Sequence, residues 1–168
     1  MSVKENAKHM IQWTVEKFNA KNAGEIAEKG LKPVEVVKAE PHNCLLLEGI
    51  AVLLGLLCGI GAETPYSNAN ASIGVGSGAT APDDEQTGLL GASKLWKGMN
   101  VGYPQTSGTN DIVFQADFDD GEAEFAWLEE TIVNDEDDTG DNLCRQNTDL
   151  GVKPAGQTWR LTGTITFS

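Results

Sequence analysis

The segment Gly74-Val-Gly-Ser-Gly-Ala79 has glycines at the spacing that can cradle a phosphate. It fits the G-x-G-x-x-A fingerprint of dinucleotide sites, where backbone amides and the start of a helix face the pyrophosphate. The following residues do not suit this chemistry, because Pro82 and the carboxylates of Asp83 and Asp84 come next. The chain also lacks the Gly-Lys-Ser/Thr of a P-loop. We therefore interpret Ser72–Asp83 as a strand that ends in a glycine-rich turn, and we expect no cofactor.

An acidic run near the C-terminal third partly resembles a calcium-binding loop. Its candidate ligands are Asp135, Asp137, Thr139 and Asp141. The twelfth position of such a loop needs a bidentate glutamate, but Gln146 stands there and no pair of helices is predicted around it. We favour a solvated acidic hairpin loop, with calcium binding as the weaker alternative.

Residues for acid–base or nucleophilic catalysis are sparse. His9 and His42 are the only histidines, and neither lies near a recognisable nucleophile motif. The adjacent Glu129 and Glu130 would alternate sides on a strand, so they do not converge as an acid–base pair. We predict that the chain is not an enzyme.

Charge and cysteine content narrow the class of protein further. The chain has 25 acidic and 12 basic residues, a net charge of −13, which argues against nucleic acid as a partner. Three cysteines without C-x-x-C spacing indicate neither a disulfide framework nor a zinc site, so a reducing compartment fits best. Cys44 and Cys58 are predicted to be small buried hydrophobes, while the role of Cys144 stays open.

The first 42 residues predict an N-terminal arm and a pair of strands. Alternating apolar and polar residues favour a strand over Ile11–Phe18, although a helix from Val3 to Phe18 is the competing interpretation. A polar connection follows, with a helical turn around Ala23–Lys29. Pro33–Glu40 is predicted to form the second strand.

The run Cys44–Cys58 is long and rich in leucine, which predicts a helix rather than a strand. Asn43 is placed to cap its N-terminus, and Gly59 supplies a stop at its C-terminus. This helix is apolar nearly all round, so it should be buried or covered by a neighbouring subunit. We do not expect a membrane span in Leu45–Ala62, because it contains Glu48 and has no basic flank. The polar N-terminus is not expected to be a signal peptide.

From Ser72 onward the sequence indicates strands and turns. The predicted strands are Ser72–Val75, Phe114–Phe118, Phe125–Val133 and Thr158–Phe167. In the last strand Gly163 falls on the apolar side, where another group could pack closely. The candidate core residues are Leu46, Leu53, Leu57, Ile73, Val75, Phe114, Phe118, Trp127, Trp159 and Ile165. We predict a mainly β chain, a β-sandwich or jelly-roll-like domain over 43–168 with one buried apolar α-helix at about 43–58. Together with 1–42 it would form one compact domain.

Several short motifs follow one another in a characteristic order after Asn43. They are Asn43-x-Leu-Leu-x-x-Gly49, Tyr66 with Ser67–Gly76, Gln86-Thr-Gly-Leu89, Phe114-x-Ala-x-Phe118, Ala123-x-Phe-Ala-Trp-x-Glu129, Leu143-x-Arg145 and Lys153-x-x-Gly-x-Thr-Trp159. In this order the chain resembles a family of small virion structural proteins of tailed bacteriophages. Cys144 stands where that pattern has a polar residue.

The resemblance implies a building block of the phage particle. The expected partners are other virion proteins, among them the major capsid protein, and further copies of this chain. Its location would be the virion, after synthesis in the host cytoplasm. We lean towards a capsid decoration or head-associated protein, with a tail, collar or fibre-base protein as the alternative.

Candidate contact segments are the Gly76–Asp84 loop and the N-terminal arm, Met1–Lys21, and two aromatic residues near Gly98 and Gly102 are further candidates. The candidate contact residues are Trp13, Gly76, Ser77, Gly78, Trp96 and Tyr103. Trp96 and Tyr103 also support a different class, a receptor- or carbohydrate-binding module, because exposed aromatic side chains can stack on sugars.

Overall fold

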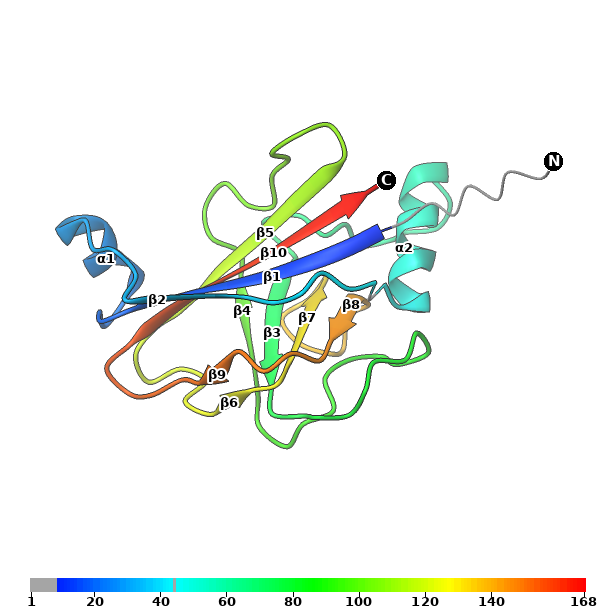
Figure 1. Cartoon of the computed structure of the whole chain (residues 1–168). Helices are drawn as coiled ribbons and strands as arrows, with labels where there is room; N and C mark the ends of the chain where they lie inside the picture. Colours follow the sequence, from blue (N-terminus) through cyan, green and yellow to red (C-terminus); the bar gives the residue numbers. More distant parts are fainter. Residues whose placement is uncertain (1–8, 44) are drawn as a thin grey trace.

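The computed structural model describes residues 9–43 and 45–168 (Figure 1). Residues 1–8 of the N-terminal arm and Cys44 therefore lie outside the described residues. The same holds for the start of the competing helix from Val3. The described chain forms two four-stranded antiparallel sheets, a two-stranded ladder and two helices. The prediction of a mainly β fold is confirmed.

The first sheet has the strand order β2-β1-β10-β5. Its central pair is β1 (His9–Phe18) and β10 (Thr158–Phe167), which pair antiparallel along all ten residues of each strand. β2 (Glu35–Lys38) and β5 (Asp111–Phe118) form the edges. The strand predicted at Ile11–Phe18 is confirmed, because its alternating side chains turn Ile11, Trp13 and Val15 into the core.

Trp13 fills the gap that Gly163 leaves on the apolar side of β10. The two residues lie directly opposite in the register of the sheet. A Cβ atom at Gly163 would lie 2.8 Å from a carbon of the Trp13 ring, so only glycine leaves room for it. Because Trp13 has no exposed surface, its prediction as a partner contact is wrong.

The second sheet has the order β4-β3-β7-β8, formed by β3 (Ser72–Gly76), β4 (Lys94–Gly98), β7 (Glu129–Val133) and β8 (Asn142–Gln146). The strand predicted over Phe125–Val133 is interrupted at Leu128. The Leu128 amide donates to the Gly76 carbonyl, and the Leu128 carbonyl accepts from the Thr148 amide. Leu128 therefore lies between two short strands instead of continuing one. The residues before it form β6 (Ala126–Trp127), which pairs with β9 (Gly151–Val152).

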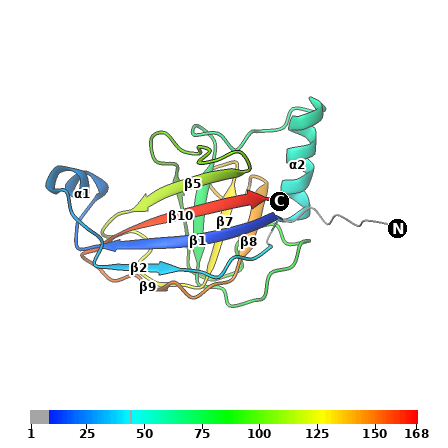
Figure 2. The ribbon, with the colours of Figure 1, turned by 45° about the horizontal axis from the view of Figure 1, so that its top comes forward.

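Side chains from both four-stranded sheets share one hydrophobic core, which makes the fold a β-sandwich. Figures 1 and 2 show that strands of one sheet cross those of the other steeply. Trp127 sits at the centre, with its ring edge-on to Phe118 at 4.8 Å and to Trp159 at 4.9 Å between centroids. Such edge-on pairs add to the burial of large aromatic surfaces. The predicted core residues are buried, except Leu53, which is half-buried, and Leu57.

The first helix, α1 (Ala23–Lys29), lies where the helical turn was predicted. The Asn22 side chain accepts a hydrogen bond from the Glu25 amide, and Gly30 ends the helix in the left-handed conformation.

The second helix, α2 (Leu47–Cys58), begins later than predicted. Asn43 does not cap it, because the helix starts only at Leu47 and the extended Leu46 stands at the N-cap position. Leu45 forms a bridge with Cys144, and the Leu46 amide donates to the Leu143 carbonyl, so this segment covers the edge of β8. Gly59 ends the helix in the left-handed conformation, as predicted.

α2 is not the buried helix that its composition predicts. Within it, Gly49 and Val52 are the buried residues, while Leu57 is 81% exposed. A Cβ atom at Gly49 would lie 2.6 Å from the Leu143 backbone, so the helix lies flush against β8 on one side only. Its other side faces away from the sandwich, and Cys58 is exposed there rather than buried.

The close packing at Gly163 predicts a stability difference between two strand glycines. Gly163→Ala should lower the free energy of unfolding by about 1–3 kcal/mol, because the added methyl group forces Trp13 to move. Gly98→Ala is the matched control. A Cβ there meets no atom within 4 Å, so this change should be neutral or slightly stabilising. Urea unfolding of both variants measures the difference, and equal effects would contradict the packing.

Candidate functional site

The glycine-rich loop after β3 does surround an anion, but the anion is a side chain of the same protein. Glu129 Oε1 accepts hydrogen bonds from the amides of Gly78 at 3.0 Å and Gly91 at 2.6 Å. The Leu90 amide also donates to this carboxylate, at 3.0 Å from Oε2. Backbone amides that converge in this way form an anion-binding concavity. Here Glu129 occupies it.

Arg145 on β8 completes this arrangement. Its Nη2 lies 2.6 Å from Glu129 Oε2 and its Nε lies 2.9 Å from the same oxygen, and neither side chain has exposed surface. The remaining guanidinium donors reach the Gln86 side chain and the Thr80 carbonyl. One ion pair therefore ties the long connection between β3 and β4 to the sheet. The sequence offered one clue to this pair, a glutamate within the strand-like run Phe125–Val133.

The same arrangement explains the glycines. A Cβ atom at Gly78 would lie 2.6 Å from Glu129 Oε1, and one at Gly76 would collide with the same carboxylate. Gly76 and Gly78 are buried and Ser77 is half-buried, so the predicted contact role of the two glycines is wrong. The exposed part of the loop is 79–85.

The neighbouring carboxyl groups of Glu129 and Glu130 have opposite electrostatic environments. Burial alone would raise the pKa of Glu129, but hydrogen bonds from Leu90 and Arg145 outweigh it and lower that pKa. Burial raises the pKa of Glu130 well above its ordinary value, and the nearby Glu129 adds to the shift. Neither Glu130 oxygen has a hydrogen-bond partner among the described residues. Glu130 is therefore expected to be neutral in the folded protein.

The acidic turn between β7 and β8 does not gather the predicted calcium ligands. Asp137 Oδ1 accepts from the Thr139 amide and hydroxyl, so these two groups are engaged with each other. Asp135, Thr139 and Asp141 line a shallow polar hollow from which Asp137 is absent. Within 9–43 and 45–168, no three histidine, cysteine or acidic residues are placed to hold a metal ion.

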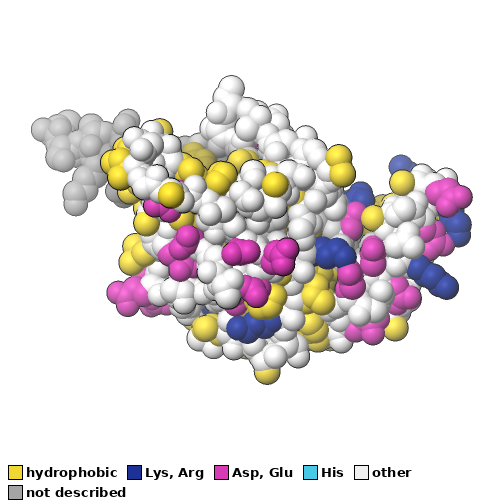
Figure 3. Space-filling view, turned by 180° about the vertical axis from the view of Figure 1, so that it is seen from behind, with side chains coloured by type: hydrophobic (Ala, Val, Ile, Leu, Met, Phe, Trp, Pro, Cys, Tyr) yellow, Lys and Arg dark blue, Asp and Glu magenta, His cyan; other side chains and the backbone are white. Residues whose placement is uncertain are grey.

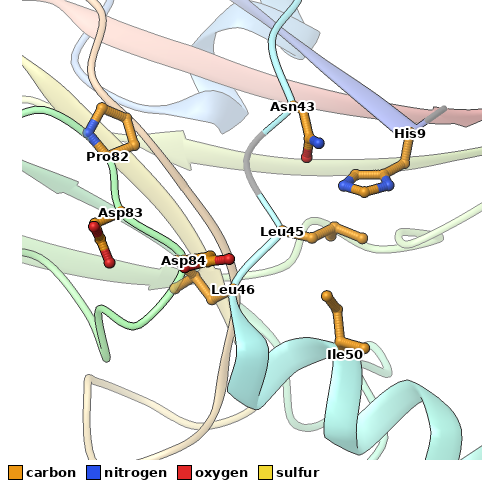
Figure 4. A pocket seen from close by; sticks show the side chains of 8 residues that line it. All are labelled: His9, Asn43, Leu45, Leu46, Ile50, Pro82, Asp83 and Asp84. Atoms are coloured by element: carbon orange, nitrogen blue, oxygen red, sulfur yellow. The ribbon is translucent and has the colours of Figure 1, made fainter. Parts of the chain in front are cut away.

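The two histidines lie in different surroundings. His9 lines a pocket of about 240 Å³ together with Asn43 and Asp83. Figure 4 shows His9 and Asn43 on one side of this pocket and Asp83 on the other, with leucine side chains between them. His42 forms a backbone bridge with Ile11. We assign no chemistry to this pocket.

Trp96 and Tyr103 are half-buried rather than exposed. A Cβ atom at Gly74 would lie 2.6 Å from the Trp96 ring, so this ring packs on the outer side of the second sheet. Trp96 also lines a pocket of about 380 Å³ with Asn68 and other small polar residues. The Asn68 side chain donates to the Tyr103 carbonyl, which holds the loop around Tyr103 close to this pocket.

The outward side of α2 is apolar and uncovered. Its exposed hydrophobic side chains, together with Ile60 just beyond the helix, are Leu47 at 50%, Leu54 at 56%, Leu57 at 81% and Ile60 at 69%. We call the outward side of the helix the α2 surface. Figure 3 shows several hydrophobic side chains toward this end of the molecule, and acidic, basic and further hydrophobic side chains interspersed over the rest of that face. Exposed apolar patches of this kind mark interaction sites.

An apolar groove lies on the other side of α2, between the helix and the sandwich. It has a volume of about 400 Å³ and separates α2 from the ends of β5 and β10. Leu53 and Leu56 line it from the helix, and Ile112 and Phe167 line it from the strands. Figures 1 and 2 show α2 at the end of the sandwich where β10 ends.

The chain matches no model of a known protein family, no curated protein and no solved structure in our comparisons. None of the described helices is both long enough and apolar enough to cross a membrane.

The buried ion pair predicts a large loss of stability when its cation is removed. Arg145→Met should lower the free energy of unfolding by about 3–5 kcal/mol, because the Glu129 carboxylate stays buried without its countercharge. Arg160→Met is the control, since Arg160 pairs with Asp117 but is partly exposed, and about 1 kcal/mol is expected. Chemical denaturation measures both losses. Similar losses would mean that the buried pair does not organise the loop.

The contrasting environments of Glu129 and Glu130 predict opposite dependences on pH. Above pH 4.5 the unfolded chain releases a proton that folded Glu130 keeps, so its contribution to stability falls as pH rises. Glu130→Gln should therefore gain stability relative to the natural chain from pH 4.5 towards neutral. Ionised Glu129 stabilises the fold above pH 4.5, and this contribution is lost in acid. The free energy of unfolding that Glu129→Gln lacks relative to the natural chain should therefore shrink as pH falls. Unfolding at several pH values measures both trends, and parallel curves would contradict the assignment.

Proposed function

We propose that this chain is a structural protein of a tailed-phage particle, a capsid decoration or head-associated building block that assembles as a homo-oligomer. The observation that carries the proposal is the α2 surface, which leaves four large aliphatic side chains at least half exposed in a chain of net charge −13. An acidic surface keeps copies apart in solution, whereas a neutral apolar surface gives them a place to join.

The energy available from this surface suits assembly. Removing Leu47, Leu54, Leu57 and Ile60 from water would contribute roughly 4–8 kcal/mol. The entropy lost on association costs a similar amount, so a single contact is weak and repeated contacts on a particle add to it. Reversible contacts that strengthen by repetition are what a lattice of subunits requires.

The motifs that resemble virion proteins hold the fold together. Gln86 and Glu129 both bind Arg145, and the Tyr66 hydroxyl donates to the Asp141 carbonyl. Lys153 is buried and donates to the Asp119 carbonyl. Structural roles of this kind fit a rigid building block better than a catalyst.

Two other roles remain as alternatives. A tail, collar or fibre-base protein would use the same surface in a ring or trimer of few copies. A carbohydrate-binding module would instead use the pocket beside Trp96, and loss of glycan-array binding in Trp96→Ala would support it.

The proposal predicts that the chain is a component of purified phage particles. Gel densitometry of particles should give roughly hundreds of copies each for decoration, and few copies for a tail ring. Leu54→Glu should reduce incorporation strongly, because it places a charge on the α2 surface. Val101→Glu is the matched control, since Val101 is 98% exposed and is not part of α2. Particles that lack the natural chain would contradict the proposal.

A further inference from the structure

Four exposed residues form a straight stripe along α2. They are Leu47, Ala51, Leu54 and Cys58, at intervals of four, three and four residues. On an α-helix this spacing places side chains in one narrow row, as in the seam of a coiled coil. The row alternates two leucines with two small side chains. No residue of the stripe carries a charge.

The order of large and small residues in the stripe is self-complementary. If two α2 helices cross antiparallel about a two-fold axis, the residue numbers of every facing pair add up to the same value. When that value is 105, Leu47 faces Cys58 of the other copy, and Ala51 faces Leu54 of the other copy. Every layer then combines one leucine with one small side chain. Parallel pairing would set leucine on leucine and alanine on alanine, which alternates crowded layers with empty ones.

We propose that α2 pairs antiparallel with α2 of a second copy of this chain, with these four residues as the seam. A two-fold contact uses the same patch on both copies, so ridge and hollow must lie together on it. The stripe meets this condition by itself, because Leu47 and Leu54 alternate along it with the small side chains of Ala51 and Cys58. This pairing deepens the assembly role proposed above and rests on it for its biological meaning.

The lack of charge on the stripe allows a second copy to approach at this surface. Two chains that each carry −13 repel one another wherever their acidic surfaces meet. Between Leu45 and Ala62, Glu48 is the one charged residue, and it already accepts a hydrogen bond from the Asn142 amide. The helix is about 18 Å long, so the seam alone buries less than a standard interface. The dimer is therefore expected to form in the micromolar range and to dissociate on dilution.

Disulfide trapping tests the antiparallel register. In a Cys44→Ala background, Leu47→Cys should give a covalent dimer under mild copper-catalysed air oxidation, because position 47 faces Cys58 of the other copy. The Cys44→Ala chain itself should stay monomeric on a non-reducing gel, because antiparallel pairing places the two Cys58 residues at opposite ends of the seam. Leu57→Cys is the control, a thiol at a more exposed position off the stripe, and it should not cross-link. Cross-linking through Cys58 alone, or equal yields at 47 and 57, would overturn the pairing.

Light scattering over a range of concentrations provides the second measurement. The natural chain should rise from one to two copies in mass, and Leu54→Glu should weaken this association by at least about tenfold. Circular dichroism checks that each variant is folded. A natural chain that stays monomeric at high concentration but is present in particles overturns the pairing and leaves the virion role standing. A chain that dimerises in solution but is absent from particles supports the pairing and contradicts the virion role.

Discussion

The ion pair between Glu129 and Arg145 is the interaction on which the rest of the structure depends. Both side chains are fully buried, and two unpaired charges in that position would be very costly. The protein meets this cost with converging backbone amides from Gly78, Leu90 and Gly91 around the carboxylate. The connection between β3 and β4 must therefore fold back onto the sheet, although it contains no helix or strand of its own.

This constraint decides which surfaces are left open. Because the loop covers the outer side of the second sheet, all residues of β3, β7 and β8 are buried. The first sheet covers the inner side through the shared core. The helix that follows β2 then packs mainly against the edge of β8, so its outward apolar side remains in solvent. The exposed helix is thus a consequence of how completely the sandwich closes elsewhere.

Sequence patterns predicted where several strands and helices lie better than they predicted which of their residues are buried. Alternation identified β1 and β10 because each of them has one face in the core, and the gap at Gly163 was visible for the same reason. β8 was missed because Asn142–Gln146 is polar in sequence yet buried on both faces, where hydrogen bonds replace hydrophobicity as the signal. The glycine spacing fits an anion site, but Pro82 and the acidic residues argued against phosphate, and only the fold reveals that the loop amides bind the internal carboxylate of Glu129. For α2, composition predicted a helix, yet burial depends on what other elements leave uncovered.

The central claim is that the α2 surface is solvent-exposed in the free chain and covered after assembly. Cys58 lies on that surface and is exposed in the isolated chain, so its alkylation rate reports on the cover directly. With Cys44 replaced by alanine, the rate is measured in dilute protein and in intact particles, and a Cys58→Ser variant defines the background. The account predicts alkylation that is at least about tenfold slower in particles. Equal rates in both states would contradict it.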